Sequence, residues 1–246
     1  MNCSSSNAAS LESLPLTQLK GVGPALVEKL NALGIHTVLD LLFHLPLRYQ
    51  DRTRLTPIAT LRHGMDVVIE GSIAGSGIVF GKRRSLLVKV QDGTGVTTLR
   101  FFHFSNAQKQ ALQNGARIRC YGEVRFGKGG LELNHPEYQL LDTTLPVPMA
   151  EHLTPVYPAT EGLQQTRLRK LLEQVLQQLA KAKALPDLLP AALRQQERFI
   201  PLLDALTLLH KPPPDISLRH LENGQHPAQV RLVFEELLAN YLSLRR

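Results

Sequence analysis

The strongest chemical signal in this sequence is a group of aromatic and basic side chains that alternate along short β-like runs. The run Arg100-Phe101-Phe102-His103-Phe104 places three phenylalanines beside an arginine. Between positions 80 and 128, ten Lys and Arg residues stand against two acidic ones. Aromatic rings stack on nucleobases and cations neutralise phosphates, so this mixture is typical of surfaces that bind single-stranded nucleic acid.

The alternation of side chains along a strand predicts which of these residues face outward. In Val96–Phe104, Phe101 falls on the face of Thr97 and Leu99 and is expected mainly in the core, whereas Phe102 and Phe104 share the opposite face with Arg100. In Arg117–Phe126, the face with Ile118, Cys120, Val124 and Phe126 suits the core. Two turns, Phe80–Arg84 and Phe126–Gly130, add basic residues at their tips. The candidate nucleic-acid-binding residues are Phe80, Lys82, Arg83, Arg84, Arg100, Phe101, Phe102, Phe104, Arg117, Arg119, Tyr121, Arg125 and Lys128.

A small closed β-barrel is the element that must position these side chains. Three β-like runs come before one helical segment, Ser105–Asn114, and two come after it. This is the order of an OB-fold, which often binds single strands through its outer face. The sequence therefore predicts an α+β protein with a five-stranded OB-fold barrel, helices before it and a helical region after it. The five runs are Asp66–Gly75, Arg84–Asp92, Val96–Phe104, Arg117–Phe126 and Leu131–Leu141.

The sequence divides into four predicted parts. They are a disordered N-terminus (1–13), a helical segment and linker (14–60), the barrel (61–145) and a proline-broken helical region (146–246). The string LKGVGPALVEKL is similar to a helix-hairpin-helix, whose turn can present backbone N–H groups to a phosphate. The alternative is that Gly21–Gly23 is only a tight turn between packed helices. The last helix, Ala228–Leu244, reaches the C-terminus without a cap, so we expect further chain beyond it.

Composition excludes several classes of protein. The net charge of +7 makes nucleic acid a plausible partner. Cys3 and Cys120 do not form a disulfide or zinc pattern, and no apolar run is long enough to span a membrane. A reducing cytoplasm is the expected compartment.

The string from Gly122 to Lys128 matches the phosphate-binding pattern GxxxxGK. However, Gly129 follows where a P-loop needs Ser or Thr, and the string lies in a predicted hairpin. We therefore expect no ATP hydrolysis by this chain alone.

Several longer strings resemble the N-terminal portion of RecG-type ATP-dependent DNA helicases. They run in order from about Leu14 to Leu242 and include GVGPALVEKL, HTVLDLLFHLPLRYQDRT, QDGTGVTTLRFFHFS, GEVRFGKGGLELNHPEY, LTPVYPATEG, LHKPPP and GQHPAQVRLVFEELLA. The Walker segments and other motor motifs of the family are absent from the sequence.

The resemblance implies a wedge that binds branched DNA, such as a replication fork or Holliday junction, in recombination and repair. The wedge would split the duplex arms through aromatics in Arg100–Phe104 and through Phe80, while a motor, absent here, pulls the DNA. ATP and Mg²⁺ are then cofactors of the full-length helicase only, and this chain needs none. The expected partners are branched and single-stranded DNA and the missing motor, with a monomer in the bacterial cytoplasm, associated with the nucleoid.

Three alternatives stay open at this point. The first is a stand-alone OB-fold protein that binds single strands or tRNA without sequence preference. The second is a protein-interaction module that uses the helices after Leu145. The third is an inert fragment. Binding to junctions, linear strands and duplexes separates them.

Overall fold

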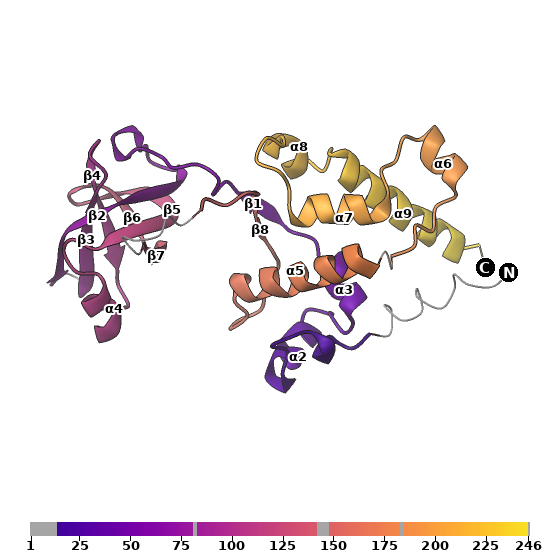
Figure 1. The fold of residues 1–246 in the computed structure, drawn as a ribbon, viewed down its shortest axis with the longest axis horizontal. Coiled ribbons are helices and arrows are strands. Elements are labelled where there is room, and N and C mark those ends of the chain that lie inside the picture. Colours follow the sequence, from indigo (N-terminus) through magenta and orange to yellow (C-terminus); the bar gives the residue numbers. More distant parts are fainter. Residues whose placement is uncertain (1–13, 81–82, 142–147, 183–184, 246) are drawn as a thin grey trace. The chain divides into compact units, whose positions relative to one another are not determined.

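The chain forms two compact units in a computed structural model that describes residues 14–80, 83–141, 148–182 and 185–245 (Figure 1). Residues 51–152 form the barrel unit, and residues 1–50 together with 153–246 form the helical unit. The expected disordered N-terminus and Lys82 lie outside the described residues.

The barrel unit is built on one six-stranded sheet. Its order is β2-β3-β4-β6-β5-β7, and β2 also pairs with β5, which closes the barrel. The β4–β6 pair is parallel and the other pairs are antiparallel. The predicted α+β class and OB-fold are confirmed. The elements are η2 (Ile58–Thr60), β2 (Asp66–Val79), β3 (Ser85–Gln91), β4 (Val96–Phe101), α4 (Asn106–Ala111), β5 (Arg117–Gly127), β6 (Gly130–Asn134) and β7 (Glu137–Leu141).

The barrel core confirms most of the predicted inward faces. Leu99 and Phe101 are buried as predicted, and so are Ile118, Cys120 and Val124 of β5; every second residue of β3, from Leu86 to Val90, is fully buried as well. One prediction needs correction: Leu131–Leu141 is two strands, because His135 takes a left-handed backbone (φ 47°) and ends the ladder before Pro136.

A second correction concerns Phe126, which was predicted in the core and is 75% exposed. Strand β5 runs beyond the barrel into a hairpin in which Phe126 pairs with Leu131. Val124 is the last residue of this strand whose side chain is fully buried in the core of the barrel. The alternation continues past that point, but there is no interior left for the ring to enter.

The helical unit joins both ends of the chain in one hydrophobic core. Leu30 and Leu41 from the N-terminal segment share this core with Leu172 and Leu206 from the C-terminal segment. Thr37 caps helix α3 (Val38–Phe43), since its hydroxyl accepts from the Asp40 N–H. The elements are η1 (Leu16–Gln18), α2 (Pro24–Asn31), α3 (Val38–Phe43), β1 (Arg48–Gln50), β8 (Thr154–Val156), α5 (Gln165–Ala182), α6 (Ala191–Gln196), α7 (Leu202–His210), α8 (Leu218–Glu222) and α9 (Pro227–Ser243).

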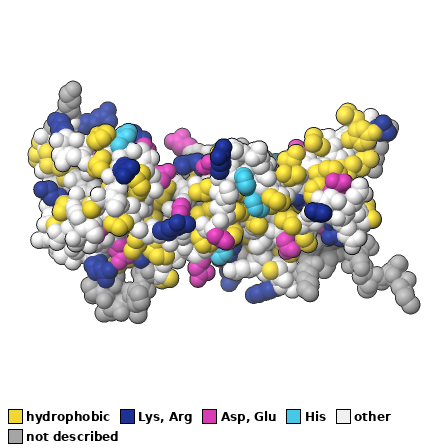
Figure 2. All heavy atoms as spheres, turned by 90° about the horizontal axis from the view of Figure 1, so that it is seen from above, with side chains coloured by type: hydrophobic (Ala, Val, Ile, Leu, Met, Phe, Trp, Pro, Cys, Tyr) yellow, Lys and Arg dark blue, Asp and Glu magenta, His cyan; other side chains and the backbone are white. Residues whose placement is uncertain are grey.

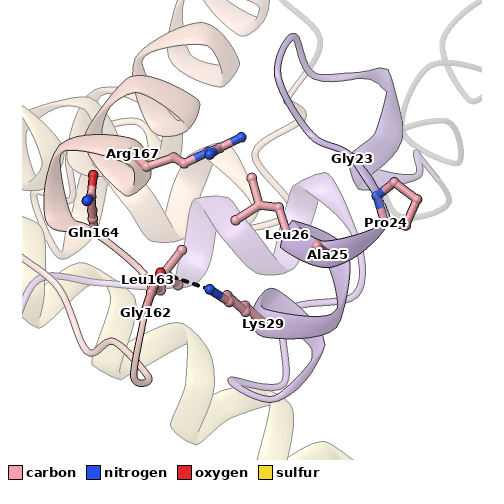
Figure 3. Close-up of a pocket in the computed structure, with 9 residues that line it drawn as sticks. All are labelled: Gly23, Pro24, Ala25, Leu26, Lys29, Gly162, Leu163, Gln164 and Arg167. Atoms are coloured by element: carbon pink, nitrogen blue, oxygen red, sulfur yellow. Dashed lines mark hydrogen bonds between the residues drawn. The ribbon is translucent and has the colours of Figure 1, made fainter.

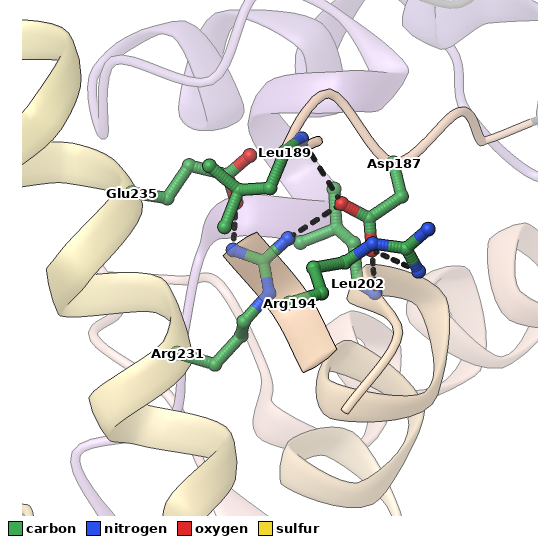
Figure 4. A network of polar contacts seen from close by, with 6 residues as sticks. All are labelled: Asp187, Leu189, Arg194, Leu202, Arg231 and Glu235. Atoms are coloured by element: carbon green, nitrogen blue, oxygen red, sulfur yellow. Dashed lines mark hydrogen bonds and ion pairs between the residues drawn. The ribbon is translucent and has the colours of Figure 1, made fainter. Parts of the chain in front are cut away.

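Two buried polar groups fix the packing of these helices. Arg231 of α9 is 0% exposed and lies between the carboxylates of Asp187 and Glu235, each 2.8 Å away (Figure 4). His210 Nε2 donates to the Leu42 carbonyl, which can only accept, so Nδ1 accepts from the Tyr157 hydroxyl. Burial lowers the pKa of His210 to about 4 and keeps its ring neutral near pH 7. In the described part of the chain, no helix has the length and apolar character of a membrane span.

Candidate nucleic-acid interface

A groove of about 900 Å³ lies on the outer face of β3, β4 and β6. The β2–β3 hairpin, with Phe80, lines it, and so does the β5–β6 hairpin, with Lys128. Thr98, Arg100 and Phe102, alternate positions from strand β4 onward, face the groove as predicted. On the face that Figure 2 shows, basic and hydrophobic side chains lie among one another over the barrel unit, at the left. This face and these two loops are where OB-folds bind nucleic acid.

His135 holds Phe102 at the end of strand β4. The Phe102 backbone N–H donates to His135 Nε2 at 3.0 Å, and the His135 N–H donates to the Arg100 carbonyl at 2.8 Å. The Phe102 and His135 rings are 5.4 Å apart and tilted by 42°. These contacts fix the backbone that carries the half-buried Phe102, so its ring is positioned before any ligand arrives.

Arg100 does not present a free charge to the groove. Its guanidinium forms a two-pronged ion pair with Glu132, at 2.7 Å, and both side chains are largely buried. Gly127 makes room for the Glu132 carboxylate, since a Cβ at position 127 would lie 2.1 Å from it. Arg100 therefore acts first as a structural partner of Glu132.

The unpaired cations of the groove are Arg83, Lys89 and Lys128. Each lines the groove, and none takes part in an ion pair with another described residue. Lys89 is a groove residue outside the thirteen candidates. It lies between the fully buried Val88 and Val90, so the alternation of side chains along β3 points it outward. These three charges are available for phosphates.

The other described candidates do not line the groove. Arg117 and Arg119 both pair with Glu70, and the guanidinium of Arg52 covers Tyr121, 3.9 Å from the ring centre. Arg84 lies over Phe104, which packs against the core. Arg125 pairs with Glu123 at 2.8 Å. Phe101 is buried, so it has no ring face free for a base. The structure thus brings Phe80, Arg83, Arg100, Phe102 and Lys128 together, whereas the other described candidates do not line the groove.

The helix-hairpin-helix-like turn lies in the helical unit, at the N-terminus of α2 (Figure 3). A pocket of about 360 Å³ lies beside it. The two basic side chains there are used internally: Lys29 Nζ donates to the Gly162 carbonyl at 3.0 Å, and Arg167 donates to the Gly21 carbonyl at 2.6 Å. These bonds tie the turn to α5 and to the loop before it. A contact between this turn and DNA stays a prediction.

Comparison with known proteins places this chain in a family. The family model described as the RecG wedge domain matches residues 15–179, which include the whole barrel unit. The chain belongs to the RecG wedge domain family. The match begins before α2 and extends through most of α5, so the RecG wedge family region includes part of the helical unit as well.

Individual relatives agree with the RecG wedge assignment. The chain is 47% identical to the ATP-dependent DNA helicase RecG of Haemophilus influenzae and 48% identical to that of Escherichia coli K12. These matches cover 96% and 95% of the chain, but 34% and 33% of the two relatives, so the chain spans about a third of their length. A solved structure of RecG bound to a three-way DNA junction matches 97% of the chain and 30% of that protein, with a TM-score of 0.70 and 26% identity.

Proposed function

We propose that this chain is the branched-DNA-binding wedge of an ATP-dependent DNA helicase that acts in recombination and repair. The observation that carries the proposal is the groove, where Phe80 and Phe102 lie near Arg83, Lys89 and Lys128, which form no ion pair with another described residue. The RecG relative bound to a three-way junction supports the choice of branched DNA as the ligand. The motor would belong to the part of the relatives that this chain does not span. One copy acts at each junction, on DNA of the bacterial nucleoid.

The mechanism we propose has two steps. Arg83, Lys89 and Lys128 first neutralise phosphates of a strand at the branch point, which releases counterions and docks the barrel. Phe102 and Phe80 then stack on bases that are unpaired at the branch. Stacking compensates for the base pairs lost there, so the wedge keeps the arms apart while the motor moves the duplex. Arg100 and Glu132 stay paired and keep the groove floor rigid.

Equilibrium binding at several salt concentrations tests this function. The purified chain is titrated with a labelled three-strand fork, a matched single strand and a matched duplex. We expect tighter binding to the fork than to either control, and an affinity that falls steeply with salt. Equal affinity for fork and single strand would favour a stand-alone single-strand-binding protein instead. No binding at low salt would leave a protein-interaction module or an inert fragment.

Replacement of Phe102 by alanine should weaken fork binding without unfolding the barrel. The side chain lines the groove and is not fully buried, so we expect a loss of roughly 1–3 kcal/mol from stacking, or about 5- to 150-fold in affinity. The measurement is fork affinity beside thermal unfolding of the same variant. Unchanged affinity with a folded barrel would remove Phe102 from the interface.

Lysines inside and outside the groove should differ in the salt dependence of binding. Lys89→Gln removes an exposed charge from the groove, whereas Lys109→Gln removes an exposed charge from α4. Both variants have the same net charge. We expect the slope of log affinity against log salt to become less steep by about one for Lys89→Gln and to stay unchanged for Lys109→Gln. Equal slopes would show that the groove does not contact phosphates.

A further inference from the structure

We propose that Phe126, supported from behind by His63, is a second platform on which an unpaired nucleobase stacks. This inference rests on the proposed function and adds to it a site that faces the groove from the β5–β6 hairpin. The ligand is a base of a single-stranded segment, of any sequence, because every base has a flat aromatic face.

The first observation is the exposure of Phe126. Its side chain is 75% exposed at a hairpin where the core of the barrel has already ended. A single exposed apolar residue needs no explanation. Phe126 is different because it lines the same groove as Phe102 and the unpaired cations.

The second observation is the geometry of the ring. The ring of Phe126 lies parallel to that of His63, with centres 4.8 Å apart and planes inclined by 11°. His63 precedes strand β2 and is itself exposed, so this stack forms outside the core. One face of Phe126 is therefore covered and its orientation is restricted. A base on its other face would extend an existing stack and would lose less side-chain entropy than one that binds a freely rotating ring.

The third observation is the surrounding charge and backbone. Lys128 follows two residues later and also lines the groove. The acidic Glu132 in the groove is neutralised by Arg100, 2.7 Å away. A base stacked on Phe126 would thus have a cation near its phosphate and no unpaired carboxylate from Glu132 against it. Phe80, 80% exposed on the opposite hairpin, lines the same groove. A strand in the groove would pass between two exposed aromatics.

The test uses the whole chain and two DNA junctions. One is a fork with a single-stranded arm that contains 2-aminopurine, and the other is a three-way junction in which every arm is paired. For Phe126→Ala, we expect affinity for the fork to fall roughly 5- to 100-fold and the 2-aminopurine fluorescence change on binding to be lost. Affinity for the fully paired junction should stay unchanged. Phe126→Trp should retain both signals, because it keeps a flat ring.

A matched control separates this site from a general loss of apolar surface. Leu140→Ala shortens another exposed apolar side chain of the barrel, on β7, which does not line the groove. It should leave both affinities unchanged. His63→Ala should reduce the fluorescence change less than Phe126→Ala does, since His63 only positions the ring.

The outcomes distinguish this inference from the proposed function. Wild-type behaviour of Phe126→Ala on the fork would overturn the stacking platform, while a preference of the wild-type chain for the fork would still support the wedge. If the wild-type chain binds a single strand as tightly as the fork, the wedge fails, and loss of the 2-aminopurine signal in Phe126→Ala would still support the platform. A wild-type chain that binds neither DNA would overturn both.

Discussion

Replacement of Glu132 by alanine should destabilise the barrel by about 3 kcal/mol. Glu132 is the partner of Arg100, and the two side chains are only 8% and 16% exposed. Removal of one partner leaves a buried charge without compensation, which typically costs about 3–5 kcal/mol. The remaining contact of Arg100 with the Ser85 hydroxyl, at 3.3 Å, is too weak to replace a carboxylate. The measurement is urea denaturation, with hydrogen exchange by mass spectrometry to assign the loss to the barrel strands.

An exposed ion pair of the same barrel is the control. Glu123 pairs with Arg125 at 2.8 Å, but both side chains are well exposed to solvent. Glu123→Ala should therefore change the free energy of unfolding by less than about 1 kcal/mol. The double variant Arg100→Met with Glu132→Leu removes both charges and should recover most of the stability. An equal loss for Glu132→Ala and Glu123→Ala would contradict our view of the groove floor.

Replacement of Asp187 by alanine should destabilise the helical unit by about 3 kcal/mol, because a buried arginine loses one of its two carboxylates and two backbone N–H groups lose their acceptor. The carboxylate accepts hydrogen bonds from the backbone N–H groups of Leu189 and Leu202, and it pairs with Arg194 and Arg231. Figure 4 shows these contacts converging on this one side chain. Without it, the fully buried Arg231 keeps Glu235 as its carboxylate partner. Denaturation with hydrogen exchange of α6, α7 and α9 measures the loss.

The control for Asp187 is the exposed pair of Lys211 and Glu173, 2.9 Å apart in the same unit. Glu173→Ala should cost less than about 1 kcal/mol. Binding to a fork should be unchanged in Asp187→Ala at temperatures where the variant is folded, because Asp187 lies in the helical unit and the groove lies in the barrel unit. A loss no larger than that of Glu173→Ala would show that Glu235 alone compensates the buried charge of Arg231.

The sequence by itself determined the barrel and which faces of its strands point inward. Local alternation placed Leu99 and Phe101 inside, and their burial confirms this. It placed Arg100 and Phe102 on the opposite face of the strand, and both line the groove on that face. This pattern is readable because successive side chains of a strand point to opposite faces, whatever the strand pairs with. The long strings that resemble RecG-type helicases indicated the family, because a match between sequences can be found without knowing which residues are in contact.

Only the tertiary structure decided which outward residues form one surface. Arg117 and Arg119 face outward as predicted, but both pair with Glu70, which lies 47 and 49 positions away in sequence. Tyr121 lies under Arg52, and Arg100 pairs with Glu132, contacts that strand alternation does not predict. Phe126 follows the inward alternation of its strand, yet it lies beyond the end of the core, because alternation gives the direction of a side chain and not the extent of the interior. The exposed phenylalanine on the β5–β6 hairpin therefore became visible only in the folded barrel.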